Sequence, residues 1–321
     1  MAGMKMPATL LTLALAPAAA SAGPFDRLVV FGDSLSDVGN VQAVTSSNVL
    51  LPTTPGPSYF DGRFSNGPVY VDSLADGLGL GPVAASLDGG DVYAYGGART
   101  SGTPLPASLV EQDVDDQVTL FLATAPADLA DDLHVVYAGG NDVAALVDNG
   151  GTAAEARAAA RGLVGQVARL RDAGVRNVLT PNLPRLGLTP RFRGNAEADA
   201  LTLAFNDELA AALDDLDAAS PGLTTYRLDV QGLFDAVVAD PSAFGFTNVS
   251  DPAAPGLDPG DQSYDGSQIV PTPDKYVFWD EFHPTAAAHD LLGERALAAI
   301  PEPAGLAVLG FALLPLRRRR V

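Results

Sequence analysis

The sequence predicts an α/β protein in which a mostly parallel sheet of five strands lies between two layers of helices, a three-layer α/β/α sandwich. Two observations carry this prediction. Short apolar runs rich in β-branched residues recur along the 321 residues, which is the pattern of strands covered on both faces. Longer amphipathic segments, several of them rich in alanine, separate these runs, and such alternation favours a parallel sheet.

Five apolar runs are predicted to be the strands of this sheet. The first is followed by Gly32, the second by Gly96 and Gly97, and the third ends shortly before Gly139. Glycine at these points permits the sharp turns that a chain needs when it leaves a strand. The predicted strands are residues 28–31, 92–95, 133–137, 175–179 and 223–228.

Five longer segments are predicted to be helices. Pro68 suits a first helical turn. Apolar residues recur every four positions from Val110 to Leu122, and Gly174 stops a long alanine-rich segment. The predicted helices are residues 68–78, 108–122, 152–173, 195–219 and 285–300.

Three stretches rich in turn-forming residues are predicted to be loops, namely residues 41–59, 182–193 and 251–266. The last is crowded with Asp, Pro and Gly. Acidic loops can supply oxygen ligands to calcium, but the spacing of an EF-hand is absent. We therefore favour a solvated acidic loop over a calcium site.

Ser34 follows the first predicted strand directly, in the segment GDSLSDVGN of residues 32–40. Open α/β sheets bind their ligands beyond the carboxyl ends of the strands, so this serine is placed where chemistry would occur. Serine is also a favoured helix N-cap, and taken alone the position favours a cap over a nucleophile.

The far end of the chain favours a chemical role for Ser34. Asp280 and His283 are three residues apart, so their side chains can meet on a turn. An aspartate that orients an imidazole, and an imidazole that takes a proton from a serine, are the parts of a nucleophilic hydrolase. Of the other histidines, His134 lies within a predicted strand and His289 within a predicted helix.

Three blocks in this order resemble the SGNH (GDSL-type) esterase/lipase family: GDSLSDVGN at 32–40, GGND at 139–142 and DEFHPT at 280–285. The segments GRFSNGPVYVDSLA at 62–75 and YAYGGART at 93–100 are similar to those of its secreted lipases and acylhydrolases. The resemblance spans nearly the whole chain between its two ends. It implies a flavodoxin-like fold and an exported serine esterase that cleaves carboxylic esters through an acyl-serine.

The same resemblance assigns roles at the site. Ser34 is the nucleophile, His283 the base and Asp280 the acid. The oxyanion would be bound by the Ser34 amide, the Asn141 side chain and a glycine amide, for which a strand end favours Gly97 over Gly62 and Gly67 within the 62–75 segment. Asn141 could instead cap a turn. No metal or organic cofactor is required for this chemistry.

Composition narrows the class of partner. The chain carries 19 basic and 39 acidic residues, a formal net charge of −20, which repels nucleic acid and anionic membranes. The absence of cysteine excludes disulfides and thiol catalysis. The expected partner is a small-molecule or lipid ester.

The two ends of the chain predict export. Lys5, an apolar run and the sequence Ala-Ser-Ala before residue 23 form a predicted signal peptide over 1–22, a substrate for signal peptidase. Residues 301–321 combine Pro-Glu-Pro, a short apolar run and four arginines, and resemble a PEP-CTERM sorting signal. This implies an exosortase-like partner, transient anchoring and delivery to the surface or matrix of a Gram-negative bacterium. A plain membrane anchor is the alternative.

The hydrolase domain is accordingly predicted over residues 23–300. Two other functions fit the same fold. A carbohydrate esterase that deacetylates extracellular polysaccharide would use the same site residues. A catalytically silent surface or matrix protein would not need them, so the complete set of Ser34, Asn141, Asp280 and His283 argues against it.

Overall fold

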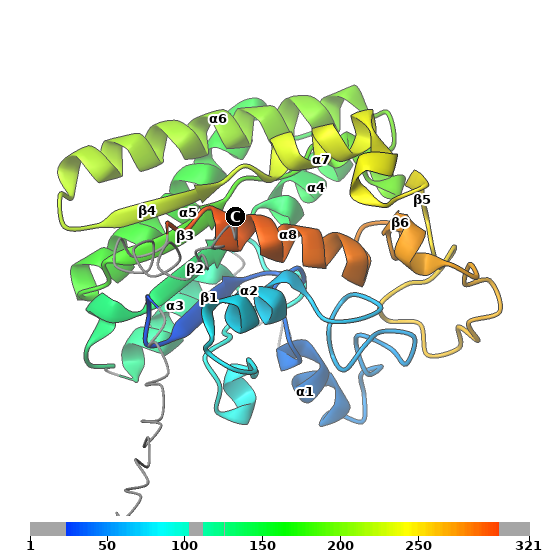
Figure 1. Cartoon of the computed structure of the whole chain (residues 1–321), viewed down its shortest axis with the longest axis horizontal. Helices are drawn as coiled ribbons and strands as arrows, with labels where there is room; N and C mark the ends of the chain where they lie inside the picture. The colour runs from blue at the N-terminus through cyan, green and yellow to red at the C-terminus, as the bar shows by residue number, and fades with distance from the viewer. Residues whose placement is uncertain (1–23, 103–111, 125, 302–321) are drawn as a thin grey trace, which may run out of the picture.

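The computed structural model describes residues 24–102, 112–124 and 126–301 (Figure 1). Its main sheet has four regular strands, β1 (Leu28–Gly32), β2 (Leu133–Tyr137), β3 (Asn177–Pro181) and β4 (Thr224–Leu228). They lie in that order and every pair is parallel. Strands β1 and β2 are buried along their whole length, as their continuous apolar sequences predict.

The second predicted strand, at 92–95, is not a regular strand, although it occupies the position of a fifth strand at the edge of the sheet beside β1. The Tyr93 amide donates to the Val30 carbonyl over 2.7 Å, and Val30 and Val92 form an isolated parallel bridge beside β1. On its outer side, the Asn40 side chain donates to the carbonyls of Val92 and Ala94 over 2.8 and 2.9 Å. These side-chain bonds replace the ladder that a further strand would supply. The order of the five segments is therefore that of a flavodoxin-like sheet.

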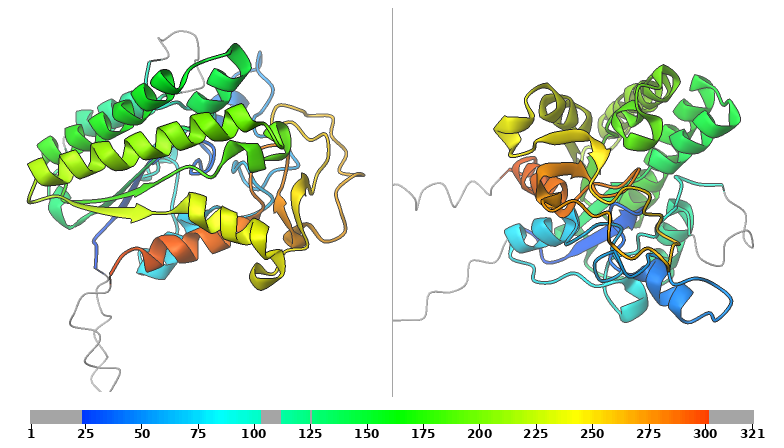
Figure 2. Two further views of the ribbon diagram at one scale, coloured as in Figure 1. Left: turned by 90° about the horizontal axis from the view of Figure 1, so that it is seen from above. Right: turned by 90° about the vertical axis from the view of Figure 1, so that its right-hand side faces the viewer.

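Helices cover both faces of the sheet, which confirms the three-layer α/β/α sandwich. Helices α5 (Ala153–Ala173) and α6 (Ala196–Ala219) pack together on one face, with α3 (Val114–Ala123) beside α5. Helices α2 (Tyr70–Leu78) and α8 (Ala286–Ala298) pack together on the other. Figure 2 shows the sheet between these two groups.

Caps explain why the predicted boundaries of the longest helices agree with the structure within a residue. Thr152 Oγ1 accepts the Glu155 amide, and the Glu155 carboxylate accepts the Thr152 amide in return. Asn195 caps α6 through its side-chain oxygen, which accepts the amides of Glu197 and Ala198. The predicted helix at 108–122 is observed from Val114, and residues 108–111 lie outside the described part.

Several elements were not predicted. The segment 41–59, interpreted as a loop, begins with α1 (Asn40–Ser46), because the Asp37 carboxylate accepts the first free amides of the helix. Helices α4 (Gly140–Asn149) and α7 (Val230–Ala239) and a parallel pair of strands, β5 (Asn248–Pro252) and β6 (Tyr276–Phe278), were also missed. Short 3₁₀ turns lie at Ser86–Asp88, Leu129–Asp131, Leu186–Leu188, Pro190–Phe192, Pro241–Phe244 and Pro273–Lys275.

A small apolar cluster joins two distant segments beside the carboxyl end of the sheet. Tyr59 packs with Ala253, Ala254, Leu257 and Trp279. The segment before α2 is thereby held against the acidic loop and the DEFHPT block. In that loop, Asp258, Asp261 and Asp265 each accept a backbone amide two residues further on, at 2.7–2.8 Å. These carboxylates stabilise turns.

The predicted signal peptide and all but the first residue of the predicted sorting segment lie outside the described residues. Within residues 24–102, 112–124 and 126–301, no helix has both the length and the apolar character needed to span a bilayer.

Candidate active site

Ser34 lies in a tight turn at the carboxyl end of β1. The amides of Ser36 and Asp37 both donate to the Asp33 carbonyl over 3.0 Å, and the Asp33 carboxylate accepts the Leu35 amide over 3.0 Å. Gly32 precedes this turn, and a Cβ there would collide with the Tyr137 carbonyl of the neighbouring strand. The glycine is thus required by close packing, and the turn directs Ser34 into the cavity described below.

The structure brings Ser34, His283 and Asp280 together. Ser34 Oγ lies 2.8 Å from His283 Nε2, and His283 Nδ1 lies 2.7 Å from Asp280 Oδ2. Because an ionised carboxylate can only accept, the imidazole proton is on Nδ1, and Nε2 is left to accept the serine proton. All three side chains are buried. This is the geometry of a nucleophile, a base and an orienting acid.

The turn that holds His283 is closed by the aspartate itself. Asp280 Oδ1 accepts the amides of Phe282 and His283 over 2.7 and 2.6 Å. The rings of Phe64 and Phe282 flank the imidazole, with centroids 5.3 and 5.7 Å away. The spacing of three residues therefore places acid and base on one turn, as predicted from the sequence.

Tyr59 contacts the same acid and was missed by the sequence analysis. Its hydroxyl donates to Asp280 Oδ2 over 2.6 Å, so this oxygen receives hydrogen bonds from both Tyr59 and His283. Tyr59 stands at the end of a segment rich in serine, threonine and proline, where no local pattern marks it.

Asp280 and His283 each stabilise the charged form of the other. Burial alone would raise the pKa of Asp280, but the charge and hydrogen bonds of His283 hold that pKa below its usual value. Burial alone would lower the pKa of His283, but the Asp280 carboxylate raises it above its usual value. The other two histidines are buried away from acids, and burial lowers the pKa of His134 and of His289 to about 3.

The predicted oxyanion donors line one cavity with Ser34. Among the described residues, the amides of Ser34 and Gly97 have no acceptor, whereas the Gly96 amide donates to Asp37 over 2.9 Å. Asn141 Nδ2 donates one hydrogen to the Ala98 carbonyl over 2.9 Å, which leaves its second hydrogen free. Gly97 and Asn141 line the cavity, and Gly62 and Gly67 do not.

This cavity has a volume of about 750 Å³. Its polar end holds Ser34, His283 and Asp280. Its remaining walls are largely apolar and come from α1, the segment between α1 and α2, the acidic loop and the DEFHPT block; they include Val41, Leu51, Pro52, Phe64, Leu257, Pro259 and Phe282. A cleft of this kind suits a small molecule with an apolar part next to a polar reacting group.

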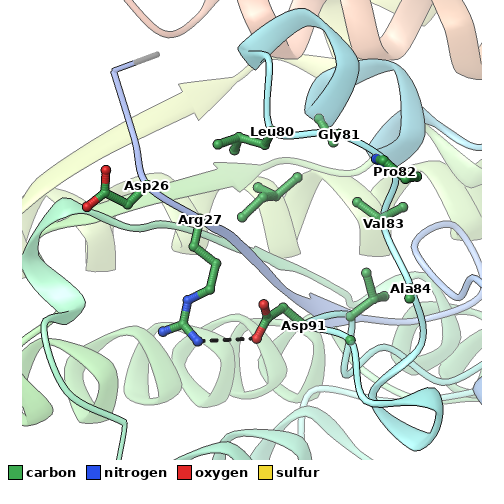
Figure 3. Close-up of a pocket in the computed structure, with 12 residues that line it drawn as sticks. Asp26, Arg27, Leu80, Gly81, Pro82, Val83, Ala84 and Asp91 are labelled. Carbon is green, nitrogen blue, oxygen red and sulfur yellow. Dashed lines mark hydrogen bonds and ion pairs between the residues drawn. The ribbon is translucent and has the colours of Figure 1, made fainter. Parts of the chain in front are cut away.

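A second cavity, of about 160 Å³, lies at the amino end of β1, where Arg27 and Asp91 form an ion pair at 3.3 Å (Figure 3). The described residues that line it include no serine or histidine. Because Arg27 precedes β1 and Ser34 follows it, the strand separates this cavity from the triad.

The acidic residues beside the motifs are held by the backbone. Asp37 accepts the amides of Gly39, Asn40, Val41 and Gly96, and burial raises the pKa of Asp37 to about 6. Thr100 donates to Asp142 through its amide and its hydroxyl, at 3.0 Å each. Burial raises the pKa of Asp142 to about 6 and that of Asp33 to about 7. Asp37 therefore fixes the loop that carries Gly97, and Asp142 ties that loop to the first turn of α4, which carries Asn141.

Within the part of the chain that the structure describes, no three side chains of histidine, aspartate or glutamate are grouped so that they could hold a metal ion. Glu281, next to the triad acid, lines the cavity and its carbonyl accepts the Arg191 amide over 2.8 Å.

A buried serine, histidine and aspartate at the carboxyl edge of a parallel sheet define the site of a serine hydrolase. Residues 28–296 match the model of the GDSL-like lipase/acylhydrolase family, and the chain belongs to this family. The predicted class of activity, hydrolysis of ester bonds, is thereby confirmed.

Curated relatives match over most of the chain. A GDSL esterase/lipase of Arabidopsis thaliana is 30% identical and covers 81% of this chain and 84% of its own. A phosphatidylcholine-sterol acyltransferase of Aeromonas hydrophila is 28% identical and covers 90% of this chain and 94% of its own. Among solved structures, a carbohydrate acetylesterase of Sinorhizobium meliloti covers 88% of this chain and 99% of its own, with 17% identity and a TM-score of 0.45.

Proposed function

We propose that this protein is an exported serine esterase in which Ser34 attacks the carbonyl of a carboxylic ester. The observation that carries the proposal is the continuous line of contacts from Ser34 Oγ through His283 to Asp280, at 2.8 and 2.7 Å. Ser34 lies 249 residues from His283 in the sequence. The two segments that carry the three residues meet at the carboxyl edge of the sheet.

The first half of the reaction forms an acyl-serine. His283 Nε2 takes the Ser34 proton as Oγ bonds to the ester carbon, and the carbonyl electrons move onto the oxygen. The protonated imidazole then gives its proton to the leaving alcohol as the ester C–O bond breaks. Asp280 stays ionised and stabilises the imidazolium, which agrees with the lowered pKa of Asp280 and the raised pKa of His283.

The tetrahedral intermediate carries its negative charge on the former carbonyl oxygen. The amides of Ser34 and Gly97 and the second hydrogen of Asn141 Nδ2 are the donors assigned to it. Because the first two have no acceptor among the described residues, they are available without breaking an existing bond. Donors already in place cost no reorganisation when the charge develops, and this is where such sites gain most of their rate.

The second half reverses the first with water as the attacking group. His283 takes a proton from water, the hydroxyl adds to the acyl carbon, and Ser34 Oγ leaves with the proton from the imidazole. The carboxylic acid is released and the free enzyme is restored. Every proton in both halves moves through His283, so no further group is needed to balance the reaction.

The acyl part of the substrate is assigned to the apolar walls of the cavity. Phe64, Leu257 and Phe282 lie among its lining residues together with Ser34. A pocket of this size and character binds a hydrocarbon chain better than a polar sugar. The name of the Aeromonas relative points to a lipid acyl donor in the same way.

Cleavage of the signal peptide over 1–22 and processing of 301–321 would deliver the enzyme to the cell surface or matrix.

Fluorophosphonate labelling tests the nucleophile. The wild type should be labelled at Ser34 and should hydrolyse p-nitrophenyl butyrate, and Ser34→Ala should lose both properties, with a fall in kcat on the order of 10⁴–10⁶. The melting temperature of the variant should stay close to that of the wild type, since a serine at a loop is replaced. Labelling at a different serine would disprove the assignment.

A further inference from the structure

Two large apolar side chains are exposed to solvent directly before residues that line the active-site cavity. Val49 is 97% and Leu50 87% exposed, in the loop that follows α1. The next residues, Leu51 and Pro52, line the cavity that holds Ser34. The exposed pair and the wall of the cavity are thus one continuous stretch of chain.

The base of this loop is fixed, so the exposure of the pair is a property of the fold. Thr45 Oγ1 accepts the Thr54 amide over 2.9 Å, which closes the loop at its ends. The Gly56 amide donates to the Pro259 carbonyl over 2.9 Å, and this attaches the loop to the acidic loop. The Leu51 amide donates to the Asn48 carbonyl over 3.0 Å, so Val49 and Leu50 form the tip of a turn.

The stretch of chain that carries the tip differs in charge from the rest of the sequence, although the acidic loop with Asp258 and Asp261 lies against its base. No residue from 38 to 60 is charged, in a chain whose net charge is −20. At the end of this uncharged stretch, Phe60 is 43% exposed as well. Exposed apolar groups that border a binding cleft are typical of a surface that is buried when the protein binds its partner.

A second copy of the chain is a poor occupant for this surface, because two bodies of the same high negative charge repel each other. An anionic membrane is a poor occupant for the same reason. An uncharged lipid surface is not repelled, and it can bury the apolar tip in its boundary region.

We propose that Val49 and Leu50 anchor the enzyme on a lipid surface without net charge, so that an acyl ester passes from that surface along Leu51 and Pro52 to Ser34. This proposal rests on the proposed function only in one part, the passage of the ester to Ser34. Adsorption of the tip itself requires no turnover, so the two claims can fail separately.

A fluorescent probe tests the anchor in the full chain. The natural sequence has no cysteine, so Leu50→Cys introduces a single site for a polarity-sensitive dye. In a Ser34→Ala background, which leaves lipid intact, phosphatidylcholine vesicles should shift the emission of this dye to the blue. Leu203→Cys, on α6 and 39% exposed, is the matched control and should show no shift. The same shift at both sites, or none at Leu50→Cys, overturns the proposal.

Vesicles of phosphatidylglycerol provide the test of charge. At low salt they should give a smaller shift at Leu50→Cys than phosphatidylcholine does, since the acidic protein is repelled. An equal or larger shift would disprove the uncharged partner. A shift without lipid that grows with protein concentration would assign the tip to contact between two copies instead.

Turnover separates the anchor from the active site. The variant Val49→Ser with Leu50→Ser should keep kcat/KM on dissolved p-nitrophenyl butyrate within about twofold and lose about tenfold or more on the same acyl group presented in phosphatidylcholine vesicles. Leu203→Ser should change neither. Equal losses on both substrates would overturn the anchor. No hydrolysis of either substrate by the wild type would refute the proposed function and leave the dye experiment valid.

Discussion

The Tyr59 hydroxyl and the His283 ring converge on a single oxygen, Asp280 Oδ2, from 2.6 and 2.7 Å. The other oxygen of the carboxylate accepts two backbone amides. Asp280 thus receives four hydrogen bonds inside a buried site and remains ionised there. Tyr59 acts on the reaction only through this acid, so it is a positioning residue.

Tyr59→Phe should lower kcat by roughly tenfold, the effect of about 1.4 kcal/mol on the barrier, because Asp280 loses one of the hydrogen bonds that hold it in place against His283. The lost hydrogen bond helps to lower the pKa of Asp280, so its removal makes the carboxylate more basic and strengthens its attraction for the imidazolium. The pKa of His283 should rise further, and the acid limb of the profile of kcat/KM against pH should move to higher pH.

Tyr226→Phe is the matched control, because that hydroxyl contacts only Asn177 in the part of the chain described, at 3.4 Å. It should leave kcat and the pH profile unchanged. If Tyr59→Phe lowers the melting temperature but does not move the acid limb, Tyr59 has only a packing role.

The contrast between Tyr59 and His283 shows what local sequence can predict. Asp280 and His283 are three residues apart, so turn geometry alone brings them together. Tyr59 lies 221 residues from Asp280, and their contact depends on the cluster that Tyr59 forms with Trp279 and Leu257. Such packing has no periodic signal in the sequence.

The missed elements have similar physical reasons. Helix α4 begins in GGND, where glycine and asparagine favour a turn, yet the chain continues as helix because Val143 and Ala144 are buried. Strand β5 carries Asn248, Ser250 and Asp251 and lies in a two-stranded sheet, so it lacks the apolar run of a central strand. Strands β1 and β2 were predictable because both of their faces are covered.

Asp33→Asn should stabilise the fold at neutral pH relative to the wild type. Burial raises the pKa of Asp33 from 3.8 to about 7, so the folded state holds its proton more tightly than the unfolded chain does. The tighter proton binding stabilises the folded state fully below about pH 4, and this stabilisation is lost as the pH rises to about 7. Across this pH range, the free energy of unfolding of the wild type should decrease relative to that of the variant, by roughly 4 kcal/mol at most.

Denaturant titrations of both proteins from pH 4 to 8 measure this difference. Because the Asp33 charge helps to raise the pKa of His283, the variant should also show an acid limb of kcat/KM at lower pH. Asp290→Asn, on the surface beside Ser73, is the control. A stability difference that does not depend on pH would contradict the titration of Asp33.

Export is tested by truncation in a Gram-negative host. A chain that keeps residues 1–22 and ends at Ile300 should leave the cytoplasm and hydrolyse p-nitrophenyl butyrate. The full chain should pass through a membrane-associated stage before processing, because 304–316 is apolar and 317–320 is basic. Finding both proteins only in the cytoplasm would refute the proposed signals.

Asn141→Ala should separate an oxyanion donor from a turn cap. A donor that acts on the developing charge stabilises the transition state more than the bound ester, so kcat should fall by about 10²–10³ while KM stays nearly constant. Asn141→Asp should be at least as damaging, because an ionised carboxylate has no hydrogen to donate and repels the oxyanion. The bond from Asn141 Nδ2 to the Ala98 carbonyl is lost in both variants, so damage from that loss alone should be similar in the two. A turn cap predicts the reverse order, since aspartate caps turns as well as asparagine does. Measurements of kcat, KM and melting temperature for both variants decide between the roles, and turnover close to that of the wild type in Asn141→Asp would exclude Asn141 from the oxyanion site.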